Sequence, residues 1–313
     1  MSRPVPALRT SILLLLAAST AWWPVARAAE APAPLPVAKR LTTVVSVDGV
    51  FSPDGSRIYF ASNRAGNNPE FLDIWAMNSD GSDVRRLTQD PANDEMPAVS
   101  PDGSRIAFRS DRTGNAEIFV MNSDGSDPRQ LTHDAGYDIH PSWTPDGSEI
   151  VFNSTRDSKN KEEPEVFEIY AVRPDGSGLR RITTDGAVST FASVSPDGKR
   201  LVYRKIVAGN SEIFVANRDG TGQVNLTRHE AFDGWPAWSP DGKQIVFASN
   251  RAGAPEVYEI YLMNSDGSNV RPLSDFRVRS TAPVFSPDGK SIVFTRSGKG
   301  FAEMFTVPVP DVP

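Results

Sequence analysis

The sequence predicts an all-β protein, a six-bladed β-propeller whose blades are four-stranded antiparallel sheets. First, a Ser/Thr-Pro-Asp-Gly turn occurs six times, with successive prolines 48, 44, 51, 44 and 47 residues apart, and such periods are typical of solenoids, propellers and arrays. Second, short strand-forming segments keep register with each turn. Third, the last repeat stops early, and a segment of matching sequence stands near the N-terminus.

The turn at the start of each repeat predicts a bulged hairpin. Proline presets φ for the second turn position, Asp is tolerated at the third, and Gly takes the position that requires positive φ. The six turns are 52–55, 100–103, 144–147, 195–198, 239–242 and 286–289.

Two apolar segments after each turn predict the second and third strands. They are short and rich in β-branched and aromatic residues, which favours strands. They do not alternate with polar residues, so both faces should be buried, as in sheets stacked between neighbours. The second strands are expected at 58–60, 106–108, 150–152, 201–203, 245–247 and 292–294, and the third at 74–77, 118–121, 169–172, 213–216, 260–263 and 304–307.

A second Asp-Gly turn follows five of the third strands and leads to a short fourth strand. This strand ends in Leu-Thr or a close variant at 87–88, 131–132, 182–183, 226–227 and 273–274. The sixth repeat stops after its third strand, and its missing Leu-Thr strand is present at 39–42. We expect this segment to complete the last blade, since closure removes an open sheet edge.

These repeats resemble the TolB-type propeller family. The resemblance consists of the Ser-Pro-Asp-Gly turn, the Ser-x-Arg-x-Gly at 62–66 and 249–253, the acid before the third strand and the Leu-Thr ending, from about Lys39 to Val307. It implies a propeller that binds proteins, with a peptidoglycan-associated lipoprotein such as Pal as the candidate partner. TolB also carries an α/β domain before its propeller, and its TolA-contacting terminus has no counterpart that we can identify here.

Residues 1–28 predict a secretory signal. Arg3 and Arg9 precede an apolar stretch at 12–21 that is too short to span a bilayer, and Ala-Arg-Ala at 26–28 fits a cleavage site. An uncleaved anchor is the alternative. We expect a Pro/Ala-rich leader at 29–38, one propeller domain at 39–313, a location in the periplasm or outside the cell, and no membrane span after cleavage.

Composition excludes several classes of function. The chain has no cysteine, so a disulfide, a lipid anchor on cysteine and a thiolate metal site are impossible. Removing the three arginines of residues 1–28 from the 33 basic residues leaves 30 against 39 acidic residues, a net charge of −9. This argues against nucleic acid, whose binding depends on neutralising phosphates, and against anionic membrane surfaces. We expect a monomer.

The first candidate site is the mouth of the axial channel. The interval from the Leu-Thr position to the next inner strand is constant, which makes Asp94, Asp138, Ser189, Asp233 and Ser280 equivalent. Met96, His140, Phe191, Trp235 and Ala282 follow, one per blade. The residues predicted to bind a partner here are Asp48, Asp94, Glu95, Asp138, His140, Asp233 and Trp235.

Three interpretations of the carboxylates stay open. They could receive a Lys or Arg of a partner. They could hold a hard cation such as calcium, with Asp94, Asp138 and Asp233 as the candidate ligands, because calcium prefers oxygen ligands. They could instead cap the loop backbone or be solvated.

The second candidate site is formed by the loops between the second and third strands, which share the channel-mouth face. These loops are long in blades 1, 3 and 5 and short in the others. Three apolar-acidic lips are predicted to dock a protein or peptide through Glu70, Phe71, Glu165, Phe167, Glu256 and Tyr258. The alternative is duplication of a two-blade unit whose extra residues pack locally.

We predict a structural role for two kinds of charged residue that recur along the chain. An acid precedes every third strand, at 73, 117, 168, 212, 259 and 303, and an arginine follows four second strands, at 64, 112, 156 and 251. We expect an Arg–carboxylate bond or a carboxylate–backbone bond to fix each loop.

Enzyme signatures are scarce. The chain has no Gly-x-Ser-x-Gly, no His-Glu-x-x-His and only three histidines. We therefore expect a non-enzymatic, exported, protein-binding scaffold of the cell envelope, without a cofactor. The alternatives are a metal-dependent lyase or hydrolase that acts on glycans or peptides at the channel mouth, and an envelope structural module.

Overall fold

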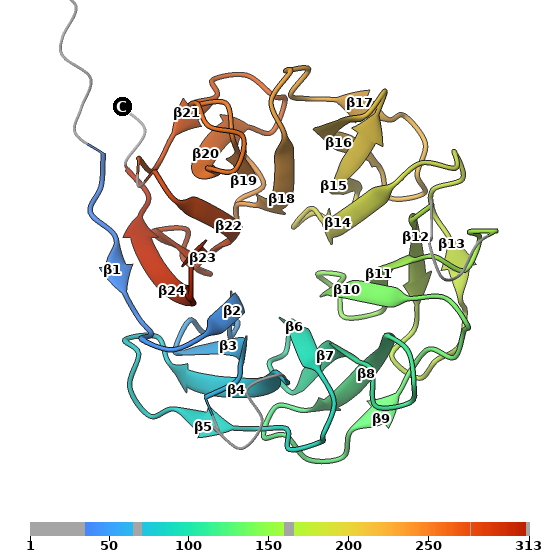
Figure 1. Cartoon of the computed structure of the whole chain (residues 1–313). Coiled ribbons are helices and arrows are strands. Elements are labelled where there is room, and N and C mark those ends of the chain that lie inside the picture. The colour runs from blue at the N-terminus through green and yellow to red at the C-terminus, as the bar shows by residue number, and fades with distance from the viewer. Residues whose placement is uncertain (1–34, 65–70, 160–165, 276, 311–313) are drawn as a thin grey trace, which may run out of the picture. The chain divides into compact units, whose positions relative to one another are not determined.

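The computed structural model describes residues 35–64, 71–159, 166–275 and 277–310. In this part of the chain all regular elements are strands, and they form six four-stranded antiparallel sheets around a central axis (Figure 1). The predicted six-bladed propeller is therefore confirmed. No helix within the described ranges is long and apolar enough to cross a membrane.

Each blade runs outward from the axis. The innermost strands are β2 (Ser46–Phe51), β6 (Asp94–Val99), β10 (Asp138–Trp143), β14 (Ser189–Val194), β18 (Asp233–Trp238) and β22 (Arg279–Phe285). The second strands are β3 (Arg57–Ser62), β7 (Arg105–Ser110), β11 (Ile150–Ser154), β15 (Arg200–Val207), β19 (Gln244–Ser249) and β23 (Ser291–Gly298).

The outer half of each blade is built in the same way. The third strands are β4 (Asp73–Asn78), β8 (Glu117–Asn122), β12 (Glu168–Val172), β16 (Asn210–Asn217), β20 (Glu259–Asn264) and β24 (Phe301–Pro308). The outermost strands are β5 (Arg85–Arg86), β9 (Arg129–Gln130), β13 (Arg180–Arg181), β17 (Val224–Asn225), β21 (Arg271–Pro272) and β1 (Lys39–Arg40).

The N-terminal strand closes the ring as predicted. The last sheet has the order β22-β23-β24-β1, with Lys39 opposite Thr306 and Arg40 opposite Phe305. Figure 1 shows β1, near the start of the described chain, beside β24 at its end. The amide of Leu41 donates to the carbonyl of Met304 at 2.8 Å, which extends the pairing by one residue.

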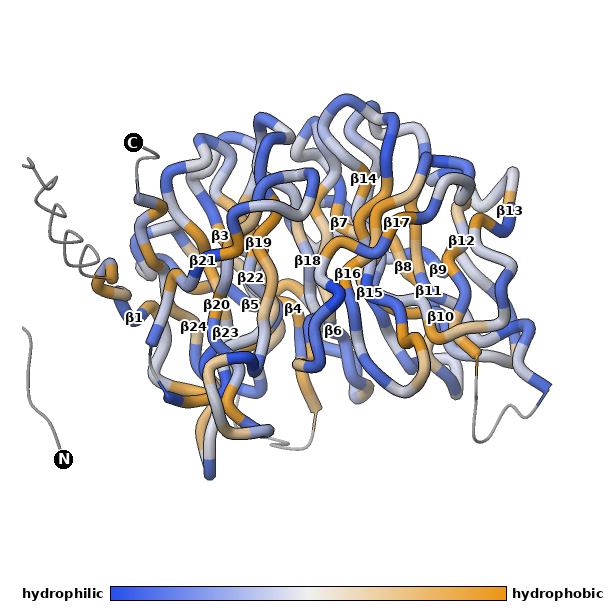
Figure 2. The backbone as a smooth tube through the Cα atoms, turned by 90° about the horizontal axis from the view of Figure 1, so that it is seen from above, coloured by the Kyte–Doolittle hydropathy of each residue, from blue (hydrophilic) through white to orange (hydrophobic). Residues whose placement is uncertain are grey.

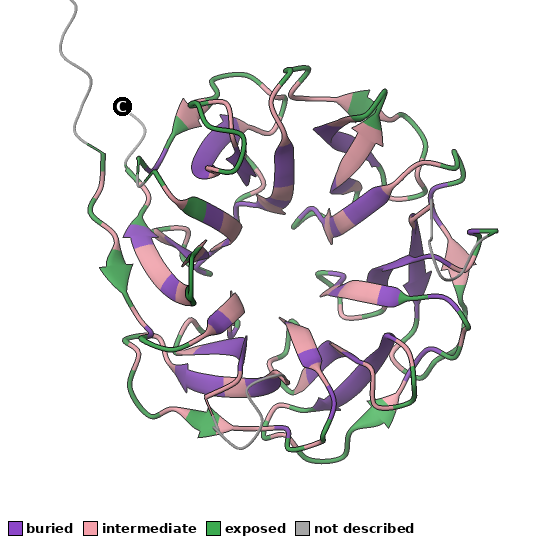
Figure 3. Ribbon diagram, viewed as in Figure 1, coloured by how far each residue is buried: buried purple, intermediate pink, exposed green. Residues whose placement is uncertain are grey.

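The hydrophobic core lies between the blades. Six clusters of buried residues each join two neighbouring blades. The second strands contribute one fully buried aromatic side chain per blade, namely Phe60, Phe108, Phe152, Tyr203, Phe247 and Phe294. The expected burial of both faces is confirmed, and Figures 2 and 3 show the hydrophobic, buried strands enclosed by more polar and exposed loops.

A repeated hydrogen-bond clamp holds the third strand to the Leu-Thr segment. In blade 2, the Thr132 hydroxyl donates to Glu117 at 2.6 Å, and the Ile118 amide donates to the Thr132 hydroxyl at 2.9 Å. The Asp134 amide also donates to Glu117, at 2.8 Å. The recurring acid before the third strand thus accepts a hydrogen bond from the backbone of the loop, which is the carboxylate–backbone bond that was one of the two predicted alternatives.

Backbone hydrogen bonds show that the loops lie on two opposite faces. The Asp94 amide donates to the carbonyl of Leu72, which brings the start of an inner strand next to a loop between second and third strands. We call this face the mouth face. The Ser79 amide donates to the carbonyl of Ser56, so the two kinds of Asp-Gly turn lie together at the other end of the strands.

Candidate functional site at the channel mouth

Each inner strand carries a bulge that aims one side chain at the axis. The strand register shifts at this point in all six blades. The residue at the shift has a positive φ of 51° to 56° and is never glycine; the six are Asp48, Met96, His140, Phe191, Trp235 and Ala282. Since this conformation costs a non-glycine residue about 1 to 2 kcal/mol, and bulges often re-aim a side chain, we call these six residues the mouth ring.

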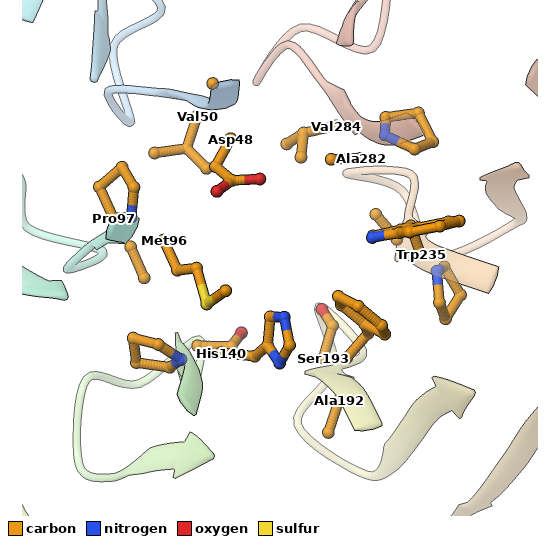
Figure 4. Close-up of a pocket in the computed structure, with 18 residues that line it drawn as sticks. Asp48, Val50, Met96, Pro97, His140, Ala192, Ser193, Trp235, Ala282 and Val284 are labelled. Carbon is orange, nitrogen blue, oxygen red and sulfur yellow. The ribbon is translucent and has the colours of Figure 1, made fainter. Parts of the chain in front are cut away.

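The mouth ring opens into a cavity of about 230 Å³ on the axis. Three consecutive residues of each inner strand line it, and most of them are apolar. Pro97, Pro141, Pro236 and Pro283 come from four of the six strands. Figure 4 shows Asp48, Met96, His140 and Trp235 pointing into this space.

One side of the mouth is a continuous group of rings. The His140 and Phe191 ring centroids are 4.0 Å apart, and Phe191 and Trp235 are 5.4 Å apart. Trp235 also contacts Phe232 and Tyr258 at 5.5 and 5.8 Å. These five residues, the aromatic wall, connect the cavity with the long loop of blade 5, so Trp235 and Tyr258 of the two predicted sites belong to one cluster.

Asp48 is the acid of the mouth ring. Burial, and the charge of nearby Glu95, raise its pKa to about 7. Glu95 does not line the cavity; it binds Arg109 at 3.3 Å, and burial raises its pKa too. Asp48 lies three blades away from Phe191 around the ring, so an acidic group faces the aromatic wall across the cavity.

His140 is a half-buried, neutral ring. Burial lowers its pKa to about 3, so the imidazole is uncharged near neutral pH. Its Nδ1 has no hydrogen-bond partner among the described residues. His133 and His229 are exposed loop residues outside the cavity lining.

Asp94, Asp138 and Asp233 do not face the cavity, which differs from their predicted position at the mouth. All three are fully buried. Each binds the recurring arginine of its own blade, namely Arg112 at 2.8 Å, Arg156 at 2.7 Å and Arg251 at 2.9 Å. Three of the four recurring arginines therefore pair with these acids and not with the acids before the third strands, which corrects the predicted pairing. The fourth, Arg64, packs over the rings of Phe60 and Trp75.

The same ion pairs occupy the three aspartates that were the candidate calcium ligands. Asp94, Asp138 and Asp233 lie in three separate blades, and each has an arginine within hydrogen-bond distance. Within the described ranges, no three His, Asp or Glu side chains are grouped in a way that could hold a metal ion. The residues present therefore do not fit a calcium site on the axis.

The lips of the long loops are only partly described. Glu70 and Glu165 lie outside the described residues, Glu256 is exposed, and Phe71 and Phe167 are half-buried. The carbonyls of Leu72, Phe167 and Tyr258 accept from the amides of Asp94, Ser189 and Ser280 in the following blades. Leu72, and not Phe71, is thus the counterpart of Phe167 and Tyr258, and the lips are tied to the adjacent inner strands.

Two family models match different parts of the chain. Residues 70–171 match the N-terminal beta propeller domain of Tricorn protease, and residues 193–311 match the TolB beta propeller domain. The predicted similarity to the TolB-type propeller is therefore confirmed over residues 193–311, while residues 70–171 match a second propeller family.

Individual proteins give a consistent result. A Tol-Pal system protein TolB of Anaeromyxobacter dehalogenans is 53% identical over 49 residues, which are 16% of this chain and only 10% of that protein. The structure of a putative TolB from Agrobacterium tumefaciens matches with a TM-score of 0.69 and 23% identity, over 86% of this chain and 92% of that one.

Enzymes share this architecture as well. An oligogalacturonate lyase from Vibrio parahaemolyticus matches with a TM-score of 0.53 and 15% identity, over 88% of this chain and 94% of that one. At these identities both structural matches establish the fold, and function has to be argued from the mouth itself.

Proposed function

Because the chain is a six-bladed propeller of TolB-type repeats, we propose that it is a non-enzymatic, exported scaffold that binds a segment of a protein partner at the channel mouth. The observation that supports this most is the aromatic wall, which runs without interruption from the axial cavity to the long loop of blade 5. A partner segment that lies on this wall would contact both candidate sites at once.

The cavity suits an apolar side chain. Its lining is largely Pro, Ala and Val, with the rings of Phe191 and Trp235 at the entrance. Burying a large apolar side chain contributes about 1.5 to 3 kcal/mol. Aromatic anchors in desolvated pockets commonly dominate the free energy of binding between proteins.

The polar groups at the mouth support binding over catalysis. The buried aspartates are committed to arginines, and the only mouth-ring histidine is neutral and half-buried. Asp48 is thus the single acid of the mouth ring. Hydrolysis of a glycan, or elimination from a sugar acid, needs a second acid–base group or a metal in addition.

We propose a location in the cell envelope, which is supported by the predicted signal at 1–28 and by the similarity to TolB proteins of the Tol-Pal system. We propose a peptidoglycan-associated lipoprotein as the class of partner. The predicted signal itself lies outside the described residues.

Site-specific crosslinking in the native envelope tests the proposal. A photoreactive phenylalanine at Ala282, in the mouth ring, should form a protein adduct, whereas one at Ser79, on the opposite face, should not. The adduct should disappear when Phe232 and Trp235 are both changed to Ser. It should persist in Phe301→Ser, which removes an exposed aromatic side chain outside the wall.

Two results would contradict the scaffold. One is equal crosslinking from both faces. The other is release of a soluble product from a glycan or peptide by the purified protein, with loss of that activity in Asp48→Asn; this result would favour the lyase or hydrolase.

A further inference from the structure

We infer that Arg204 forms a carboxylate-binding subsite beside the aromatic wall, and that the partner segment carries an acidic group next to the apolar side chain that enters the cavity. This deepens the proposed function and rests on it. The inference follows from a comparison between two blades of the same chain.

Arg204 and Arg109 occupy equivalent positions in blades 4 and 2. Arg109 lies opposite Glu95 in the strand register and binds both Glu95 and Asp111, each at 3.3 Å. Arg204 lies opposite Thr190 in the same register. Blade 4 has Thr190 and Ile206 where blade 2 has these two acids, so Arg204 lacks both carboxylates.

The structure holds the Arg204 guanidinium in place with aromatic rings instead. Its Cζ lies 5.8 Å from the Phe191 centroid and 5.3 Å from the Phe232 centroid. Gly234 permits this packing, because a Cβ there would lie 2.7 Å from the Phe232 ring and 3.6 Å from Cδ of Arg204. Arg204 is half-buried and makes no ion pair with a described carboxylate.

Polar atoms of this cation and of strands β14 and β10 lack partners. Arg204 Nε, the Thr190 hydroxyl and His140 Nδ1 have no hydrogen-bond partner within the described part of the chain. Thr190 is only 5% exposed, and directly opposed residues of an antiparallel pair place their side chains on the same face. Buried polar groups are normally paired, and an incoming carboxylate can accept from the guanidinium and from the hydroxyl.

The surroundings favour a peptide over an acidic sugar. The cavity next to Arg204 is lined largely by Pro, Ala, Val and aromatic side chains. Sugar hydroxyls buried there would lose their hydrogen bonds to water without replacement. An apolar side chain with a neighbouring carboxylate matches both the cavity and the cation.

A pair of matched probes tests the subsite in the full-length mature protein. N-acetyl-L-phenylalanine is an anion at pH 7, and N-acetyl-L-phenylalaninamide is its neutral counterpart. We would titrate both, followed by NMR of the arginine Nε–Hε and tryptophan signals. The anion should bind about tenfold more tightly to the unmodified protein, since a hydrogen bond to a charged group contributes about 1.5 to 3 kcal/mol.

Three variants assign the difference to Arg204. Arg204→Gln should abolish the preference for the anion. Thr190→Glu should also abolish it, because it restores the internal carboxylate that blade 2 has, and it should raise the thermal midpoint. Arg200→Gln should keep the preference, because Arg200 lies on the same strand and packs over Trp238 at 4.8 Å.

The outcomes separate this inference from the scaffold proposal. Equal binding of the two probes, or a preference that persists in both Arg204→Gln and Thr190→Glu, would refute the carboxylate subsite alone. Failure of both probes to perturb the Trp235 signal would refute the binding of an apolar side chain at the mouth. Tighter binding of D-galacturonate than of N-acetyl-L-phenylalanine would overturn the assignment to a peptide.

Discussion

At the scale of single residues, the mouth ring concentrates backbone strain and chemical variety in the same place. All six of its members have positive φ, yet their side chains range from Ala282 to Trp235. Strained backbone is retained where the surrounding structure enforces it, and it is common at binding sites. Here the strand pairing on both sides of each bulge enforces it, so the side chain can vary without loss of the fold.

Asp48 should make stability depend on pH in an unusual direction. Its pKa is about 7 in the folded chain and ordinary in the unfolded chain, so between about pH 4 and 7 the folded state binds more protons. Stability therefore falls as pH rises through this window. Asp48→Asn removes the penalty and suits positive φ, so the free energy of unfolding at pH 8 should rise by about 1 to 3 kcal/mol, with little change at pH 4.

Urea denaturation at the two pH values measures this effect. Asp54→Asn is a control with the opposite sign, because hydrogen bonds from Ser52 and Ser56 lower the pKa of Asp54 to about 2. That variant should lose stability at pH 8. If Asp48→Asn shifts stability equally at pH 4 and pH 8, the ionisation of Asp48 is not its cause.

At the scale of secondary-structure elements, blades 2 to 6 fix their mouth loops in two ways. In blades 2, 3 and 5 a buried aspartate of the inner strand binds the arginine after the second strand. Blades 4 and 6 have Ser189 and Ser280 at this position and lack the arginine. Their second and third strands are eight residues long and pair to the end of the hairpin, so ladder bonds replace the ion pair.

We therefore expect the fold to tolerate replacement of both Asp94 and Arg112, but to lose stability when only one of them is replaced. Arg112→Val alone leaves a buried, unpaired carboxylate and should cost about 3 to 5 kcal/mol of unfolding free energy. Asp94→Ser combined with Arg112→Val copies blade 4 and should recover at least half of that loss. The two single variants and the double variant form a double-mutant cycle, which urea denaturation would complete.

An exposed pair provides the comparison for this cycle. Arg129 and Asp127 bind at 2.6 Å but are both well exposed, so Arg129→Val should change stability by less than about 1 kcal/mol. A double variant in blade 2 that is as unstable as the sum of its single variants would show that blade 2 has no alternative to the ion pair.

The strands and turns could be predicted well from the sequence because the residues that define the repeat act on the local backbone. Turn residues, apolar strands and the Leu-Thr ending each act within a few positions, and six copies reinforce the pattern. The partners of the charges were harder to predict, because the sequence offers Arg112 two candidate acids, Asp94 and Glu117. Only the register of β6 against β7 selects Asp94.

The site was predicted in part for a similar reason. Periodicity identified His140 and Trp235 as equivalent residues, one per blade, and the structure places both at the cavity together with Asp48. Phe232 and Arg204 were missed because they belong to different blades and meet only across a blade interface. A comparison of Arg204 with Arg109 in the repeat alignment would have indicated that its carboxylates are missing.

At the scale of the whole molecule, the ring depends on one short strand. Thr42 supplies to blade 6 the clamp that the Leu-Thr segment supplies elsewhere, since the Met304 amide donates to its hydroxyl at 2.9 Å. Arg40 also pairs with Glu303, the acid before the third strand. A segment from the beginning of the described chain therefore finishes the sheet that the end of the chain begins.

Removal of residues 1–42 should consequently open the ring. β24 would become an unpaired edge, and the clamp around Met304 would lose its hydroxyl. We expect the thermal midpoint to fall by about 10 °C or more, since each kcal/mol lost corresponds to about 2 to 4 °C in a chain of this size, and we expect association that increases with concentration. Removal of residues 1–34 is the matched control and should leave both properties unchanged. Calorimetry and light scattering on the two truncated proteins would measure this, and equal midpoints would mean that the blade interfaces, without the N-terminal strand, are sufficient to keep the propeller closed.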